Sequence, residues 1–231
     1  MKIVTQELLD SYLKNDWVLE KLQTPAALSD DSFTIQRWLK DTPPKRAVFE
    51  QVYGDLFKDG PRKSVLDVGG GFCALTRELA KNHDYDLLEI SAHDAADKIH
   101  AVESDIGRPF FIESEWSAYT PQRSYDIIIA NDLFPNVDQR LSLFLERYLP
   151  FAKEMRLSLT FYNTPRTYPT KRINADEILY MLAYDGAHTA LALEKYAGQI
   201  GVDKLAMLKD TTISVYPNGR HVALVTLKNN T

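Results

Sequence analysis

The sequence predicts an α/β fold with a doubly wound, mostly parallel sheet that ends in an antiparallel hairpin, preceded by an N-terminal helical cap. Three observations predict it. Strand-length apolar runs alternate with amphipathic helical runs from about residue 61 onward. A glycine-rich turn joins the first of these strands to the first of these helices. Near the C-terminus an Asn-Gly pair separates two strand-like runs, which is typical of a hairpin.

We expect residues 1–60 to form the helical cap and residues 61–231 the main domain. Leu8, Leu9 and Tyr12 begin an apolar stripe at helical spacing, which Pro25 ends. Two further helices, over 32–40 and 45–57, are each followed by a proline-containing breaker. The cap could cover a ligand, and its candidate contacts are Tyr12, Trp17, Phe33, Arg37 and Trp38.

In the main domain the alternation predicts parallel strands and the helices that connect them. The run at 125–130, YDIIIA, is typical of a strand buried on both faces. The last third departs from the alternation, with two successive helices and then the hairpin around Asn218-Gly219. The predicted strands cover 64–68, 85–90, 109–112, 125–130, 156–162, 212–216 and 221–227, and the predicted helices cover 73–81, 93–102, 138–149, 175–184 and 188–198.

Composition excludes several classes of protein. The chain has 231 residues, of which 45% are hydrophobic and 26% charged, as in a folded globular protein. A formal net charge of −5 argues against a nucleic-acid partner. The sequence has no apolar run long enough to cross a membrane and no secretory signal pattern at its start. A lone cysteine, Cys73, offers no internal disulfide, so we expect a cytoplasmic protein.

The glycine turn, SVLDVGGGFCALTRELA, indicates a nucleoside cofactor. Glycines let a ligand approach the backbone closely and permit positive φ. Glu89 ends the second predicted strand, twenty residues after Gly69, where a carboxylate can accept hydrogen bonds from both ribose hydroxyls. The pattern Gly69-x-Gly71-x-x-Ala74 also fits a loose dinucleotide fingerprint, so NAD stays open as the cofactor.

The same stretch resembles motif I of class I S-adenosylmethionine-dependent methyltransferases, in which an acid precedes the glycines by two residues, as Asp67 does here. A carboxylate there would repel a pyrophosphate but suits a cofactor with an ammonium and a sulfonium. The segment 124–134, SYDIIIANDLF, is similar to motif IV of that family, and the terminal hairpin matches its reversed last strands. The family often has glycine where this chain has Cys73. The resemblance covers roughly residues 60–231 and implies a Rossmann-like fold.

The resemblance also implies a cofactor-binding set. Asp67 and the glycines would hold the methionine part of S-adenosylmethionine, Glu89 the ribose, and Ile90 the adenine. Glu115 would bind the adenine amino group with Trp116 stacking beside it, and Glu113 is the alternative to Glu115. The full set is Asp67, Gly69, Gly70, Gly71, Glu89, Ile90, Ser114, Glu115, Trp116 and Asn131.

Candidate acceptor and catalytic residues follow the fourth and fifth strands, at the sheet edge where α/β proteins bind ligands. Asp132, His188 and Tyr162 are candidates for a group that takes a proton from an acceptor hydroxyl. His221 is a further candidate for this role, although its place beside the hairpin turn favours a surface position. A basic loop could bind a phosphate or carboxylate through Arg166, Lys171 and Arg172, with Tyr168 against a sugar ring. We expect no metal site, because the spacing of histidines and carboxylates forms no ligand set.

The function predicted is transfer of a methyl group from S-adenosylmethionine to oxygen of a small, anionic acceptor of sugar or phosphate type. Residues 131–141 and 173–186, with the basic loop, resemble methyltransferases of bacterial surface-polysaccharide pathways. The predicted partner is a small molecule, without nucleic acid or membrane, and a homodimer is considered. Two alternatives stay open: an NAD-dependent oxidoreductase and a non-catalytic cofactor-binding regulatory domain. Single residues also have alternative roles that stay open. Asp132 could be a helix cap, and Glu115 and the basic loop could be solvated surface.

Overall fold

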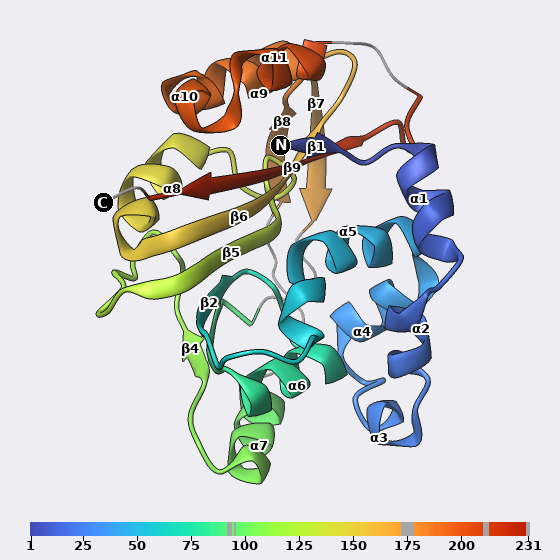
Figure 1. Ribbon diagram of the computed structural model, residues 1–231, viewed down its shortest axis with the longest axis vertical. Helices are drawn as coiled ribbons and strands as arrows, with labels where there is room; N and C mark the ends of the chain where they lie inside the picture. Colours follow the sequence, from blue (N-terminus) through green and yellow to red (C-terminus); the bar gives the residue numbers. More distant parts are fainter. Residues whose placement is uncertain (92–93, 95, 172–177, 210–212, 230–231) are drawn as a thin grey trace.

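The computed structural model describes residues 1–91, 94, 96–171, 178–209 and 213–229 (Figure 1). These residues form a seven-stranded sheet in the order β1-β9-β6-β5-β2-β3-β4 and a separate two-stranded sheet, β7-β8. The central strands pair in parallel, whereas β9 runs antiparallel to both of its neighbours. The strands are β1 (Lys2–Ile3), β2 (Ser64–Val68), β3 (Asp84–Glu89), β4 (Phe111–Glu113), β5 (Tyr125–Phe134), β6 (Ala152–Phe161), β7 (Arg166–Lys171), β8 (Ile178–Ala183) and β9 (His221–Lys228).

Helices cover both faces of the large sheet (Figure 1). Neighbouring residues of one strand face opposite ways, so Val65 and Ile127 pack against one helical layer and Leu66 and Ile128 against the other. The first layer is made by α1, α2 and α4–α7, and the second by α8–α11. The helices are α1 (Gln6–Leu13), α2 (Trp17–Leu22), α3 (Pro25–Leu28), α4 (Thr34–Asp41), α5 (Pro43–Tyr53), α6 (Ala74–Asn82), α7 (Ala96–Ile106), α8 (Leu141–Tyr148), α9 (Gly186–Leu193), α10 (Ala197–Ile200) and α11 (Val202–Ala206).

The N-terminal helices are fastened to the first crossover helix, α6. The buried Gln36 side chain of α4 accepts a hydrogen bond from the Ala74 N–H at 2.9 Å, which satisfies one of the free donors at the start of α6. Arg77 of α6 donates to both oxygens of the buried Asp30 carboxylate. In addition, β1 adds an edge strand to the large sheet through β9. These contacts hold α4 and α5 over the glycine turn.

The structure confirms the predicted fold class, and most predicted strands lie within a few residues of their observed bounds. The helix predicted over 175–184 is wrong, because residues 178–183 form β8, while 175–177 lie outside the described residues. Leu, Met and Ala are good helix formers, but the side chains of this run alternate between exposed and covered as β8 pairs with β7.

The antiparallel hairpin also lies elsewhere than predicted. Residues 213–216 form no strand, and residue 212 lies outside the described part of the chain. The run after the Asn218-Gly219 turn forms β9, which pairs with β6 and β1 instead of a hairpin partner. The hairpin of this fold is β7-β8, and its strand β7 lies in the segment that the sequence predicted to be a basic loop. Within the described ranges, no helix is long and apolar enough to span a bilayer.

Candidate active site

The turn between β2 and α6 has a backbone that requires glycine. Gly69 has φ of +71° and Gly71 has φ of +65°, a region that residues with side chains rarely adopt. A Cβ on Gly70 would overlap the Asp67 carboxylate behind the turn, and one on Gly71 would overlap Ile35 of α4. The turn is therefore packed from both sides, and its Gly69 and Gly70 line a cleft.

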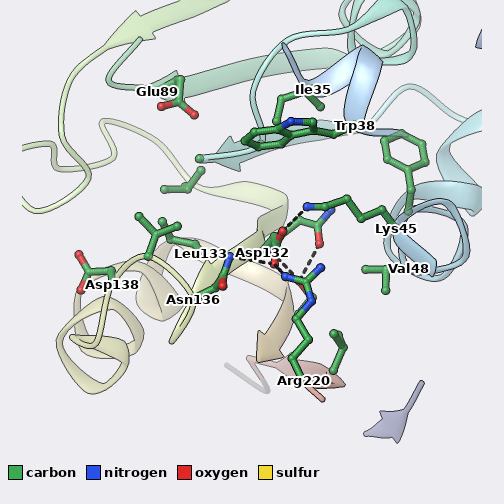
Figure 2. Close-up of a pocket in the computed structure, with 18 of the residues that line it drawn as sticks. Ile35, Trp38, Lys45, Val48, Glu89, Asp132, Leu133, Asn136, Asp138 and Arg220 are labelled. Carbon is green, nitrogen blue, oxygen red and sulfur yellow. Dashed lines mark hydrogen bonds and ion pairs between the residues drawn. The ribbon is translucent and has the colours of Figure 1, made fainter. Parts of the chain in front are cut away.

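This cleft has a volume of about 740 Å³, within the range typical of ligand sites. It is lined by residues at the carboxyl ends of β2, β3, β5 and β6, by residues of α4 and α5, and by residues of the β7-β8 hairpin. Figure 2 shows Glu89 at one side of it and Lys45, Asp132 and Arg220 at the other. Twelve residues predicted for the cofactor or the acceptor line it: Gly69, Gly70, Glu89, Ile90, Ser114, Glu115, Trp116, Asn131, Asp132, Tyr162, Arg166 and Tyr168.

Asp67 lies behind the glycine turn and is fully buried. Its carboxylate accepts hydrogen bonds from the hydroxyls of Tyr53, at 3.0 Å, and Tyr85, at 2.7 Å. Burial raises the pKa of this carboxyl to about 7; the two tyrosine hydrogen bonds oppose that rise and the charge of Glu89 adds to it. Asp67 and Gly71 are not among the lining residues, so Asp67 acts on the cleft through the turn that it supports.

The half of the cleft around β3 and β4 is acidic. Glu89 ends β3 and accepts a hydrogen bond from the Ile90 N–H at 2.8 Å. Beyond it, Arg140 donates to Glu115 at 2.6 Å and to Asp138 at 2.6 Å. The hydrogen bond and charge of Arg140 hold the pKa of Glu115 below its usual value, so this carboxylate stays ionised near neutral pH.

Trp116 does not fit its predicted stacking role. Although the residue borders the cleft, its ring is buried in edge contacts with Phe134 and Phe144. The Arg140 guanidinium lies over the ring, 4.7 Å from its centroid, and the indole N–H donates to Asp138 at 3.1 Å. The tryptophan therefore anchors the Arg140–Asp138 pair in the wall of the cleft.

Asp132, at the end of β5, is held by partners from three other parts of the chain. Its φ of +60° is unusual for a residue with a side chain. Its N–H donates to Ser158 Oγ of β6 at 2.6 Å, Lys45 Nζ bonds one carboxylate oxygen, and Arg220 Nη1 lies 3.5 Å from the other (Figure 2). Burial would raise the pKa of this carboxyl, but the charges of Lys45 and Arg220 outweigh burial and lower it.

The lowered pKa makes Asp132 a weak proton acceptor at neutral pH, which argues against the predicted role as general base. The nearby phenols are no better suited. Burial raises the pKa of Tyr168, and it raises the pKa of Tyr216 to about 12, so both stay protonated. Tyr162 lies with its ring under the guanidinium of Arg166, whose Cζ is 3.8 Å from the ring centroid.

His188 is not part of the cleft. It lies in the first turn of α9, its side chain is 53% exposed, and its Nδ1 is 2.8 Å from the Asp185 carboxylate that caps this helix. It does not line the cleft, which argues against its predicted role as a general base. His221, expected at the surface, is instead buried in β9 against Phe161.

The side chains of two residues predicted to bind the acceptor are not described. Lys171 ends β7, and only its backbone position is described, while Arg172 lies outside the described residues. Glu113, the alternative adenine contact, is exposed at the end of β4 and does not line the cleft. The predictions for Lys171 and Arg172 stay predictions.

Trp38, a candidate contact of the cap, lines the cleft. Other cleft residues had no signal in the sequence: Lys45, Asp138, Arg140, Ser158 and Arg220. Lys45 and Arg220 reach Asp132 across 87 and 88 residues of chain. No local motif marks such pairs. Among the described residues, no group of three or more His, Cys, Asp or Glu side chains is placed to hold a metal ion.

No family model matches this chain, and no curated protein matches it in sequence. Among solved structures it is similar to the 1,6-didemethyltoxoflavin-N1-methyltransferase of Burkholderia thailandensis with bound 1,6-didemethyltoxoflavin and S-adenosylhomocysteine. The TM-score is 0.53 at 14% identity, covering 100% of this chain and 93% of that chain. Weaker similarities are to a DhpI–SAH complex, with TM-score 0.48, 16% identity and coverage of 99% and 100%, and to the plantazolicin methyltransferase BpumL, with TM-score 0.47, 15% identity and coverage of 97% and 100%.

The fold and the first of these similarities define the class of architecture. The sheet order, the glycine turn after β2 and the full-length match to a methyltransferase show that the chain has the class I methyltransferase fold. An identity of 14% shows the fold alone, and the chemistry depends on the residues of the cleft.

Proposed function

We propose that this chain is an S-adenosylmethionine-dependent methyltransferase that acts on a small anionic acceptor. One observation carries the proposal: a single cleft joins a glycine turn and a strand-end carboxylate, Glu89, to a basic region formed by Lys45, Arg166 and Arg220. The first part suits a cationic nucleoside cofactor, and the second suits an anion.

The residues of the cofactor half fit this cofactor. The backbone of Gly69 and Gly70 is open to the cleft, and a Cβ on Gly70 would push against Asp67. Glu89 would accept hydrogen bonds from the ribose hydroxyls, Ile90 would pack on the adenine, and Ser114 and Glu115 would lie near its amino group. When bound, S-adenosylmethionine supplies a methyl group activated by its sulfonium, so the protein's own task is to orient both ligands and exclude water.

The charges of the cleft support an anionic acceptor. Among the described residues that line the cleft, the cofactor half holds three carboxylates, Glu89, Glu115 and Asp138, and one cation, Arg140, whereas the other half holds three cations, Lys45, Arg166 and Arg220, and one carboxylate, Asp132. A cofactor with a net positive charge and an acceptor with a negative charge would therefore each meet the opposite sign. Oppositely charged ligands in adjacent parts of one cleft also orient each other.

Within this proposal, methylation falls on oxygen of a sugar or phosphate-type acceptor. The basic half of the cleft supports the phosphate-type group, and Tyr168 offers a ring against which a sugar can pack. A role in surface-polysaccharide biosynthesis rests on the sequence resemblance alone. A cytoplasmic location, a homodimer and the division into a cap of residues 1–60 and a domain of 61–231 are further parts of the proposal.

Titration calorimetry with S-adenosylhomocysteine and, separately, with NAD tests the cofactor. We expect heat of binding with S-adenosylhomocysteine and none with NAD. Glu89→Gln should weaken binding by at least ~10-fold, because it removes a charged acceptor of two hydrogen bonds. The matched control is Glu113→Gln, an exposed carboxylate at the end of the next strand, which should bind as the parent does. Heat with NAD only would overturn the proposal in favour of an oxidoreductase.

Transfer of a radiolabelled methyl group tests the activity itself. The chain should label a component among sugar phosphates, nucleotide sugars or cell extracts, and Arg166→Ala should reduce the labelling while S-adenosylhomocysteine binding is retained. A chain that binds the cofactor but labels nothing in any of these pools would favour the non-catalytic regulatory domain.

A further inference from the structure

Arg220 is the most buried of the three cations in the acceptor half of the cleft, with only 8% of its surface exposed. It immediately precedes β9, and its guanidinium lies over the Tyr216 ring, 4.0 Å from the centroid. Nη1 faces Asp132 Oδ1 at 3.5 Å, which is at the limit of a hydrogen bond. Among the described residues its buried Nε has no hydrogen-bond partner. A guanidinium with a buried, unused donor at the wall of a cleft is therefore poised for a ligand.

Among the described residues that line the cleft, those around Arg220 carry more positive than negative charge. Lys45 and Arg220 share one carboxylate, Asp132, which Lys45 bonds closely and Arg220 only loosely. Arg166 adds a third cation and pairs with rings and the Asn218 carbonyl. Burying a cation without full compensation is unfavourable, so an arrangement of this kind is stable when an anion completes it.

We propose that Arg220, with Lys45, forms an oxyanion subsite that binds a carboxylate or phosphate-type group of the acceptor. A guanidinium carries paired N–H donors in one plane, an arrangement that matches two oxygens of such a group. Asp132 is the internal anion that keeps the two cations paired when no ligand is bound, and the ligand competes with it for Arg220. The assignment of the ligand as the methyl acceptor rests on the proposed function, whereas the anion subsite rests on these contacts alone.

Competition with Asp132 predicts effects of opposite sign. Asp132→Asn removes the competing charge and so strengthens anion binding. If Asp132 bound the acceptor directly, the same substitution would weaken binding. Arg220→Gln removes the paired donors and weakens anion binding. Arg220→Lys keeps the charge but not the paired donors, so its affinity falls between those of the parent and Arg220→Gln.

The test is calorimetric titration of the full chain with methylphosphonate and, in a second arm, with acetate. For the parent we expect a Kd on the order of 1 mM for the better probe, as befits so small a ligand. Arg220→Gln should bind at least ~10-fold more weakly and Asp132→Asn ~3-fold or more tightly. Arg123→Gln, an arginine paired with Asp84 and Asp86 at the other end of the sheet, is the matched control and should bind as the parent does.

The probe that binds more tightly, methylphosphonate or acetate, identifies the group that the subsite prefers, phosphate type or carboxylate. Equal affinity of the parent and Arg220→Gln, or weaker binding to a folded Asp132→Asn chain, would overturn the proposal; circular dichroism reports whether each variant folds. S-Adenosylhomocysteine binding is measured on the same samples. Anion binding without S-adenosylhomocysteine binding would refute the proposed function and leave the subsite standing, and the reverse result would refute the subsite alone.

Discussion

Asp67 makes the stability of the protein depend on pH in a direction unusual for a carboxylate. The group is buried behind the glycine turn, its pKa is raised to about 7, and its polar contacts are the hydroxyls of Tyr53 and Tyr85. Asp67→Asn keeps the size of the side chain and can still pair with both hydroxyls, but it cannot ionise. Comparing the parent with this variant therefore isolates the cost of burying the charge.

The magnitude follows from the difference between the folded pKa, about 7, and the ordinary value of 3.8. Because the folded pKa is raised, the unfolded chain loses its proton first, and the folded state becomes less favourable as pH rises from 3.8 to 7. Below this window the penalty is absent, and above it the penalty is constant. Each pKa unit corresponds to 1.36 kcal/mol, so the penalty grows by roughly 2–3 kcal/mol between pH 5 and pH 8.

Urea unfolding followed by circular dichroism at pH 5 and pH 8 measures this penalty. The free energy of unfolding of Asp67→Asn minus that of the parent should be larger at pH 8 by roughly 2–3 kcal/mol. Asp203→Asn, an exposed carboxylate in α11, is the control and should give the same difference at both pH values. A difference for Asp67→Asn that is equal at both pH values, or larger at pH 5, would show that burial does not raise the pKa of Asp67.

Three further predictions concern the turn, the β5–β6 contact and the excluded histidine. Gly71→Ala should lower the free energy of unfolding by about 1–3 kcal/mol in urea unfolding, because φ is positive and the new methyl overlaps Ile35. Adding Ile35→Ala should restore only the part of this loss that the overlap causes, not the part caused by the positive φ. Ser158→Ala removes the hydroxyl that donates to Asn131 Oδ1 at 2.6 Å and accepts from the Asp132 N–H. It should destabilise the protein by about 1–3 kcal/mol in the same assay, and an unchanged midpoint would contradict the contact. His188→Ala should leave methyl transfer at the parental rate in the radiolabel assay, and a loss of rate with S-adenosylhomocysteine binding retained would return this histidine to the catalytic site.

Much of the fold could be predicted from the sequence because the relevant signals are local. Short apolar runs such as 64–68 and 125–130 predict strands from their own residues alone. A glycine-rich turn between a strand and a helix can likewise be recognised without knowledge of its distant contacts. The β8 strand was missed because its residues favour helix locally and adopt a strand only through pairing with β7. The strand predicted over 212–216 was wrong because β9 finds its partners in β6 and β1, which are distant in sequence.

The site divides in the same way. Glu89 and the glycines belong to one short segment, so their spacing was visible, whereas the partners of Asp132 come from α5 and from the start of β9. These partners decide the chemistry, since two cations turn a candidate base into a fixed anion. The residue type at the end of β5 was predictable, but its protonation was not. Arg220 follows an ordinary turn in the sequence, and only the fold shows that it lines the cleft.

We propose that the cleft beside the glycine turn binds a sulfonium nucleoside through Glu89. A crystal structure grown with S-adenosylhomocysteine tests this most directly. We expect the ribose hydroxyls within hydrogen-bonding distance of the Glu89 carboxylate and the adenine against Ile90. A nucleoside bound away from Glu89, or a cleft that remains without one while Ile35 covers the turn, would contradict it.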